Sequence, residues 1–286
     1  MSAVASQPES AAAPSQHDVM AQAGSENFPV ASLLLGRRER AQLLAIYGFA
    51  RLVDDIGDEA QGDRLALLDW LERDLDRTYR GEEPEHPVMR ALAPTIAACS
   101  LPDQPFRRLV EANRRDQSVT RYETFDELLG YCQLSAAPVG ELVLHVFASA
   151  TAERIALSDR VCAALQVLEH LQDVGEDFAR GRVYMPREDM ARFACDEHEL
   201  GASSLTPRLR ELLAFETTRT RSLLDSGAPL IRTLPLRPRL AVAGFVAGGR
   251  ASLDALEHAG YEVLAARPRA TKGSFARRWL TAVAGR

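Results

Sequence analysis

The chain has 286 residues, enough for one large domain or two small ones, and 46% of them are hydrophobic, which is ample for a core. The formal net charge of −6 excludes a general nucleic-acid-binding protein, because such proteins carry a surplus of lysine and arginine. Collagen-like, coiled-coil and low-complexity classes are excluded by the ordinary globular composition.

The first 24 residues are rich in Ala, Ser, Pro and Gln without periodicity, which predicts a disordered tail ahead of a domain over 25–286. Beyond the tail, apolar residues recur at steps of three and four, as in amphipathic helices. No segment shows the alternation of period two that is typical of a half-buried strand. We therefore expect a single all-α domain with helices over 37–59, 63–80, 87–98, 105–118, 124–134, 138–150, 159–179, 207–226 and 237–259.

The C-terminal stretch Arg267–Arg286 carries six basic residues and no acid. Phe275, Trp279 and Leu280 would form the apolar face of a helix that touches an anionic membrane surface, and a solvated tail is the alternative. No apolar stretch reaches the roughly 18 residues of a membrane-spanning helix, and the N-terminus lacks a secretory signal. The four widely spaced cysteines are typical of free thiols, so we expect a cytoplasmic protein, with peripheral membrane contact as an option.

Acidic residues stand near the end of the strongly apolar helix predicted over 37–59. Asp54 and Asp58 are four residues apart and therefore share one helix face. Like charges at this spacing destabilise a helix by roughly 0.2–0.5 kcal/mol, and Gly57 adds up to about 1 kcal/mol. These costs indicate a compensating cation, whereas a solvated acidic face is the alternative interpretation.

A second acidic face occurs in the helix predicted over 159–179. Asp173 and Asp177 repeat the spacing of four, Glu169 extends the face one turn back, and Gln166 lies beyond it. If the two acidic helices faced each other, hard oxygen ligands would line one cavity, and such ligands suit Mg²⁺. We therefore expect Asp54, Asp58, Asp173 and Asp177 to bind Mg²⁺, which would stabilise a departing diphosphate.

Arginine and tyrosine residues flank both acidic faces. Arg51 lies one turn before the first pair, and Arg182 follows the second pair, with Tyr184 close by. Arginine holds phosphate in a fork geometry that lysine does not reproduce. Tyr47 and Tyr131 lie on apolar helices and would face a developing carbocation, although such aromatic residues more often belong to the core.

Several short segments occur in a characteristic order along the chain. They are NFPVAS at 27–32, IYGFAR at 46–51 followed by DDIGD, Tyr131–Cys132, PVG at 138–140, QDVGED at 172–177 and GRVYMP at 181–186. This ordered set resembles the squalene and phytoene synthase family of head-to-head isoprenoid synthases, over roughly residues 25–280. NFPVAS and the pair Gln172–Asp173 are most similar to the HpnC-type, hydroxysqualene-forming branch of bacterial hopanoid biosynthesis.

The resemblance implies an isoprenoid synthase helical bundle around a central apolar cavity. It implies a Mg²⁺-dependent lyase that converts presqualene diphosphate into hydroxysqualene, with water capturing the carbocation. It also implies cooperation with a presqualene diphosphate synthase and a downstream oxidoreductase. The catalytic residues are expected to be Asp54, Asp58, Asp173, Asp177, Tyr131 and Glu169. The substrate-binding residues are expected to be Phe28, Tyr47, Arg51, Gln166, Arg182 and Tyr184.

Two positions depart from the pattern of many family members, which have Asn in place of Glu169 and Arg in place of Gln172. Glu169 would either join the metal ligands, orient the attacking water as a general base, or face solvent at the rim. The absence of a nucleotide-binding fingerprint argues against hydride delivery. The alternative enzyme is a presqualene diphosphate or phytoene synthase that condenses two prenyl diphosphates, and the non-catalytic alternative is a helical scaffold with solvated acidic faces.

Overall fold

A computed structural model describes residues 13–16 and 35–284, and this part of the chain is helical and contains no strand. The all-α prediction is therefore confirmed. The chain divides into two compact units. Of the described residues, the first unit contains those up to Ser118 together with Pro138–Ala150, and the second contains Val119–Ala137 together with those from Thr151 onward.

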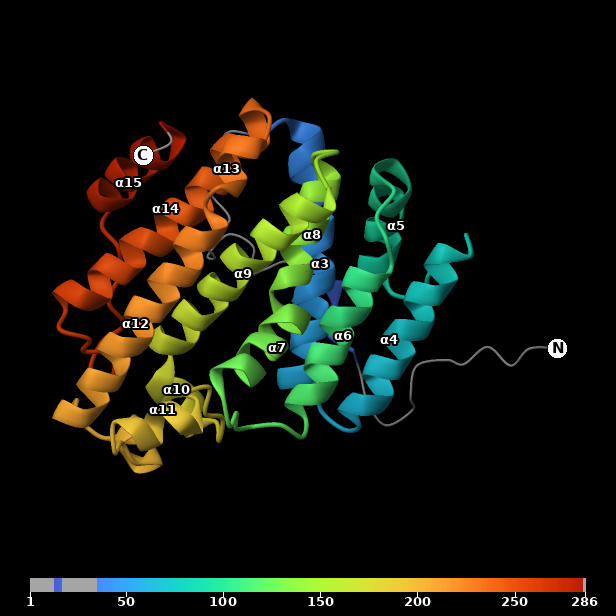
Figure 1. Ribbon diagram of the computed structural model, residues 1–286. Helices are drawn as coiled ribbons and strands as arrows, with labels where there is room; N and C mark the ends of the chain where they lie inside the picture. Colours follow the sequence, from blue (N-terminus) through green and yellow to red (C-terminus); the bar gives the residue numbers. More distant parts are fainter. Residues whose placement is uncertain (1–12, 17–34, 285–286) are drawn as a thin grey trace. The chain divides into compact units, whose positions relative to one another are not determined.

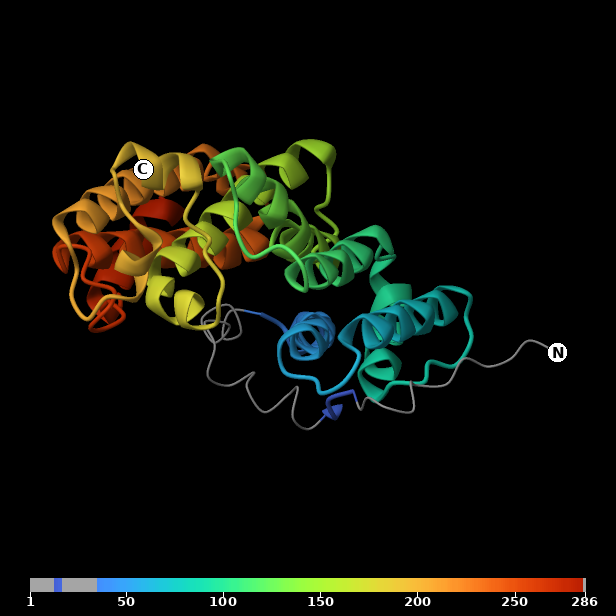
Figure 2. The same ribbon diagram turned by 90° about the horizontal axis from the view of Figure 1, so that it is seen from below.

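Helix α3 is the central element of the first unit, and it packs against α4, α5 and α6. Figure 2 shows α3 (blue) almost end-on. The side chains of α3 at 49, 52, 53 and 56 are fully buried, and their spacing is the predicted helical period. The Phe49 ring contacts the Phe106 ring edge to face, with 4.9 Å between the ring centroids. The helices of this unit are α3 (Arg37–Asp58), α4 (Arg64–Tyr79), α5 (Pro87–Cys99), α6 (Gln104–Asp116) and α8 (Ala137–Val146).

Helix α12 packs against α9 and α14 in the second unit, and α15 packs on α14 (Figure 1). A Cβ atom at Gly227 of α12 would lie 2.7 Å from the Leu157 carbonyl oxygen, so only glycine permits this approach to α9. The elements are α7 (Phe125–Ser135), α9 (Ala152–Gln172), α10 (Val174–Ala179), α11 (Arg187–Arg192), a 3₁₀ helix (Glu197–Gly201), α12 (Pro207–Gly227), α13 (Leu230–Thr233), α14 (Leu236–His258) and α15 (Lys272–Val283).

Side-chain caps fix where many of these helices begin. A carboxylate or hydroxyl oxygen accepts a hydrogen bond from a backbone N–H three residues further on at Asp63, Thr124, Thr151, Thr206 and Thr271. Most predicted bounds agree closely with the observed ones. The helix predicted over 138–150 instead ends at Val146, because Ala148 adopts a left-handed conformation with φ of 49°.

The predicted tail over 1–24 and the substrate-binding candidate Phe28 lie largely or wholly outside the described residues. Within the short described stretch 13–16, the Pro14 carbonyl oxygen lies 3.1 Å from His86 Nε2, and Ala13 packs against the core of the first unit.

The C-terminal helix α15 uses most of its predicted apolar face within the chain. Phe275 lies against Gly248, and Trp279 donates a hydrogen bond to the Leu240 carbonyl oxygen at 3.2 Å, whereas Leu280 is exposed. Membrane contact through this helix stays a prediction, now limited to Leu280 and its basic neighbours. Among the described residues, no helix is long and apolar enough to cross a bilayer.

Two buried carboxylates share one arginine in the second unit and join α7, α11 and α12. Arg219 Nη2 lies 2.6 Å from Asp189 Oδ2 and also pairs with Glu216, and its guanidinium group lies 3.6 Å from the centroid of the Phe125 ring. Burial raises the pKa of Glu216 to about 7, and this shift is opposed by Arg219 and reinforced by Asp189.

The raised pKa of Glu216 predicts that folding favours its protonated form. This contribution to stability is complete below the ordinary pKa of 4.5 and is lost as the pH rises through about 7. Relative to Glu216→Gln, which does not ionise, the wild type should lose roughly 2–3 kcal/mol of unfolding free energy between about pH 5 and about pH 8. Urea denaturation across this range measures the difference, and the exposed Glu211→Gln on the same helix is the control. A difference that does not vary with pH would contradict the prediction.

Candidate active site

The two aspartates of the first motif lie on the exposed face of α3, opposite its buried apolar stripe. Asn113 of α6 donates a hydrogen bond from Nδ2 to Asp54 Oδ1 at 3.1 Å. Desolvation raises the pKa of the Asp54 carboxyl, with Asn113 opposing and Asp58 adding to the shift. The Asp54 residue is nevertheless exposed, so its carboxyl is open to a cation.

Gly57 has a packing role that the sequence did not indicate. A Cβ atom at this position would lie 2.1 Å from Asn113 Oδ1, and the Gly57 carbonyl oxygen accepts a hydrogen bond from Gln117 Nε2 at 3.0 Å. Glycine is therefore required for the close approach of α3 and α6. The cost of this glycine is offset by helix packing, so it is not evidence for a bound cation.

The Arg51 side chain is engaged by acids on its own helix and just beyond it. Its Nη2 lies 2.6 Å from Asp55 Oδ1 and 3.2 Å from Glu59 Oε1. Tyr47, one turn earlier, is buried in the first unit. The substrate-binding roles of Arg51 and Tyr47 stay predictions, and a phosphate would compete with Asp55 and Glu59 for the Arg51 guanidinium.

The second motif lies at a break between two helices, and the prediction of one continuous helix over 159–179 is wrong. Helix α9 begins at Ala152 and ends at Gln172, and Asp173, with φ of −106° and ψ of 15°, separates it from α10. The backbone bonds from Asp173 N–H to Glu169 O (2.9 Å) and from Asp177 N–H to Asp173 O (2.8 Å) nevertheless continue across the break. The spacing of four therefore still relates these three acids.

Arg267 is the cation that the structure places beside these acids. Its Nε lies 3.1 Å from Asp173 Oδ1, and its Nη2 lies 4.0 Å from Glu169 Oε1. The side chains of Asp173 and Asp177 are 19% and 17% exposed, whereas that of Glu169 is 60% exposed. Burial raises the pKa of Asp173 to about 6, Arg267 opposes the shift, and Glu169 and Asp177 add to it.

The segment around Arg267 is held in place by the residue just before Asp173. Gln172 Nε2 donates a hydrogen bond to the Pro268 carbonyl oxygen at 3.0 Å. Gln172 therefore positions Arg267 relative to the acids.

Aromatic rings gather beside Asp177 in the second unit. The His170 ring stacks on Tyr184 at 3.7 Å between centroids, and Tyr131 and Tyr122 each lie 5.8 Å from the Tyr184 ring. His170 Nδ1 lies 3.6 Å from Asp177 Oδ2. The predicted residues Tyr131 and Tyr184 are thus brought together, next to a predicted metal ligand. They offer a π-rich wall that can stabilise positive charge.

Backbone pairing between two loops positions this aromatic cluster. The Val183 N–H donates to Thr120 O at 2.9 Å, and the Arg187 N–H donates to Tyr122 O at 3.0 Å. Gly181, with φ of 80°, allows the turn that starts the second of these loops. Arg182 lies in this turn, half-buried, and its N–H donates to the Asp177 carbonyl oxygen at 2.9 Å.

Gln166 contacts the aromatic cluster through histidine, since its Nε2 lies 3.2 Å from His170 Nε2. Four contributors were missed as site residues by sequence reasoning: Asn113, Tyr122, His170 and Arg267. Two of them could have been identified from features of the sequence. His170 falls among the acids of the second motif, and Arg267 opens the basic, acid-free C-terminal stretch, which is a natural counterpart for an acidic face.

The carboxylates fit the ligand set that Mg²⁺ requires, which is one or two carboxylates completed by water and phosphate oxygens. Asp54 and Asp58 offer exposed oxygens in the first unit, and Asp173 and Asp177 offer partly exposed ones in the second. Within residues 13–16 and 35–284, no three His, Cys, Asp or Glu side chains are grouped so as to hold a metal by themselves.

The helices form the all-α isoprenoid synthase fold. The structure aligns with the crystal structure of squalene synthase HpnC from Alicyclobacillus acidocaldarius with a TM-score of 0.80 and 42% identity, over 86% of this chain and 93% of that one. A dehydrosqualene synthase with bound ligand shares the fold with a TM-score of 0.84 at 24% identity, over 94% of both chains. Residues 21–274 match the squalene/phytoene synthase family, and the chain belongs to this family of isoprenoid synthases.

Relatives within the family catalyse more than one reaction. The chain is 40% identical to a hydroxysqualene synthase from Rhodopseudomonas palustris over 210 residues, which are 72% of this chain and 70% of that protein. It is 32% identical to a 15-cis-phytoene synthase from Synechococcus elongatus over 261 residues, which are 85% of this chain and 83% of that protein.

Proposed function

We infer that the protein converts presqualene diphosphate into hydroxysqualene in a Mg²⁺-dependent reaction. The observation that carries this proposal is the 40% identity to a hydroxysqualene synthase, on a chain that contains two aspartate pairs. The carbon–oxygen bond to the diphosphate breaks and its electron pair leaves with the diphosphate. Water adds to the carbocation that remains and loses a proton, which yields the alcohol.

The residues have separate roles in this proposal. Asp54, Asp58, Asp173 and Asp177 would hold Mg²⁺, which when bound supplies the positive charge that stabilises a departing diphosphate. Arg51 and Arg182 would bind the phosphate oxygens. The neighbouring rings of Tyr131 and Tyr184 would face the carbocation, and their low polarity would limit the water that reaches it. Gln166 would act indirectly, by orienting His170.

A second candidate is condensation of two prenyl diphosphates, as in a phytoene or presqualene diphosphate synthase. The match to 15-cis-phytoene synthase favours it, because that match covers 85% of the chain. In the preferred reaction, a presqualene diphosphate synthase would supply the substrate and an oxidoreductase would consume the alcohol.

Product analysis distinguishes the two reactions. The purified enzyme is given presqualene diphosphate or farnesyl diphosphate separately, each with Mg²⁺ and with or without NADPH. We expect hydroxysqualene from presqualene diphosphate alone, without NADPH. Consumption of farnesyl diphosphate only would favour condensation, and squalene that forms only with NADPH would indicate a reductive enzyme.

A further inference from the structure

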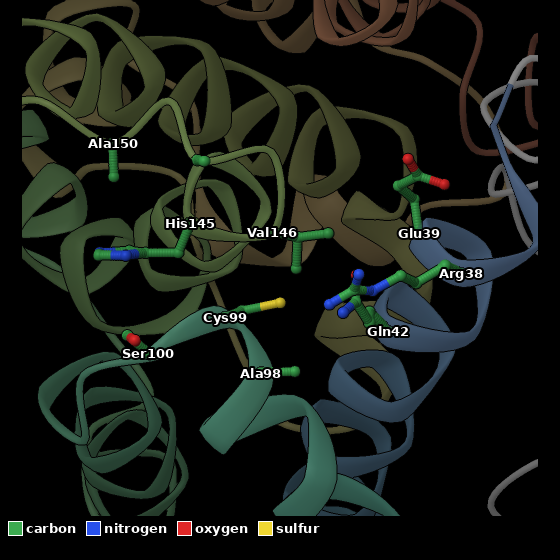
Figure 3. A pocket seen from close by; sticks show the side chains of 10 residues that line it. Arg38, Glu39, Gln42, Ala98, Cys99, Ser100, His145, Val146 and Ala150 are labelled. Atoms are coloured by element: carbon green, nitrogen blue, oxygen red, sulfur yellow. The ribbon is translucent and has the colours of Figure 1, made fainter.

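A cavity of about 600 Å³ lies within the first unit, and none of the predicted metal ligands lines it (Figure 3). It is formed by the first turns of α3, the C-terminal end of α5 and the end of α8 with the loop that follows. Arg38 lines the cavity, whereas Asp54 lies on the same helix about 24 Å further along, at 1.5 Å per residue. The cavity is therefore separate from the acidic end of α3.

Gln42 is the buried polar side chain of this cavity. It is only 8% exposed, and it forms no hydrogen bond with another residue of the described chain. Gln42 and Arg38 are four residues apart on α3 and line the cavity together with Cys99 (Figure 3). The amide atoms are not sealed off from the cavity, so a ligand there can pair with them and form a hydrogen bond in a largely buried setting.

The start of α3 carries an excess of positive charge. Its first turn contains three arginines, Arg37, Arg38 and Arg40, and one acid, Glu39. The N-terminus of a helix is itself electropositive. Arg38 pairs with no carboxylate in the described part of the chain. Figure 3 shows the Glu39 carboxylate pointing away from Gln42 and Cys99. This electropositive end of the cavity is suited to an anion.

The cavity also has an apolar part, built from small side chains. Ala98, Val146 and Ala150 line the cavity, and Ser100 and His145 add two further polar groups. The volume falls within the roughly 300–1,000 Å³ of small-molecule sites. This lining suits a ligand with an anionic head group and a short hydrocarbon part.

We propose that this cavity binds an amphiphilic phosphate. The phosphate oxygens accept hydrogen bonds from the Arg38 guanidinium and the Gln42 amide, and the hydrocarbon part packs against Val146 and the neighbouring alanines. Arginine suits this role because its planar fork donates two bonds to one phosphate. A soluble prenyl or alkyl phosphate and a phospholipid head group share this chemistry. The site does not depend on the proposed catalytic function.

Calorimetric titration with octyl phosphate tests the site on the full-length protein. EDTA is present throughout, so that metal-dependent phosphate binding elsewhere does not contribute. Arg38→Ala and Gln42→Leu should each weaken binding by about tenfold or more. Arg38→Ala removes a charge-assisted hydrogen bond to the phosphate, and Gln42→Leu removes the hydrogen bond from the buried amide. Arg37→Ala is the matched control, because it removes the same charge from the same turn at a residue that does not line the cavity.

Cys99 provides a second, local measurement because its thiol lines the cavity. Octyl phosphate should slow alkylation of Cys99, mapped by peptide mass spectrometry, and leave the rate at the half-buried Cys162 unchanged. This protection should be lost in Arg38→Ala and retained in Arg37→Ala.

Vesicles separate the two sources of the ligand. If phosphatidic acid vesicles bind the wild type and Arg37→Ala but not Arg38→Ala, the ligand is a lipid head group; octyl phosphate binding without vesicle binding indicates a soluble phosphate. The proposal is overturned if neither probe binds the wild type, or if Arg38→Ala and Gln42→Leu bind the probe as strongly as the wild type does.

Discussion

Asp54→Asn and Asp173→Asn should each lower the rate of diphosphate release by about 1,000-fold or more, which corresponds to roughly 4 kcal/mol of transition-state stabilisation. Each substitution removes a negative charge from a predicted Mg²⁺ site and keeps the shape of the side chain. Asn at position 54 also keeps the oxygen that accepts the hydrogen bond from Asn113. Steady-state assays at saturating Mg²⁺ measure the loss.

Stability should hardly change in these variants, because the substitution relieves repulsion between like charges, and a partly exposed pair such as Asp173–Arg267 contributes little. The control is Glu153→Gln, which removes an exposed acid from the first turn of α9. Full activity in either aspartate variant, or in enzyme treated with EDTA, would show that the reaction does not use the metal site.

Glu169→Ala should change the product rather than stop the reaction. The side chain is 60% exposed and lies one turn before Asp173, so it can reach a water molecule at the rim of the acidic face. If its carboxylate orients the water that captures the carbocation, its loss leaves diphosphate release intact. The product should then shift from the alcohol to eliminated or rearranged hydrocarbons, as measured by gas chromatography and mass spectrometry.

Two other variants make this result interpretable. Glu169→Gln keeps a hydrogen-bond acceptor and should retain more of the alcohol than Glu169→Ala, and Glu176→Ala removes an exposed acid from the neighbouring turn as a control. An unchanged product ratio at normal turnover would exclude the water-orienting role. Slower diphosphate release with an altered Mg²⁺ requirement would instead assign Glu169 to the metal ligands.

The parts of the fold that sequence predicts well are those set by local periodicity. Phe49, Leu52, Val53 and Ile56 follow the helical period, as predicted, and are fully buried, which leaves Asp54 on the opposite face. The break at Asp173 could not be predicted from the same signal, because the spacing of four and its backbone bonds continue through it.

Contacts between segments that are far apart in the sequence could not be predicted from the spacing of residues. Asn113 stands 59 residues from Asp54, and its fit against Gly57 depends on how closely two helices pack. Arg267 reaches Asp173 only because the segment after α14 folds back onto the end of α9, where Gln172 holds it. A motif identifies the residue types of such a site, whereas tertiary packing selects their partners.

The central claim, capture of the carbocation by water, is tested most directly by the origin of the hydroxyl oxygen. Presqualene diphosphate is converted in water enriched in heavy oxygen, and the alcohol is analysed by mass spectrometry. Because the diphosphate leaves with the oxygen of the broken bond, the hydroxysqualene should carry heavy oxygen from the solvent. An alcohol that retains light oxygen would mean that a phosphorus–oxygen bond was cleaved and would contradict the account.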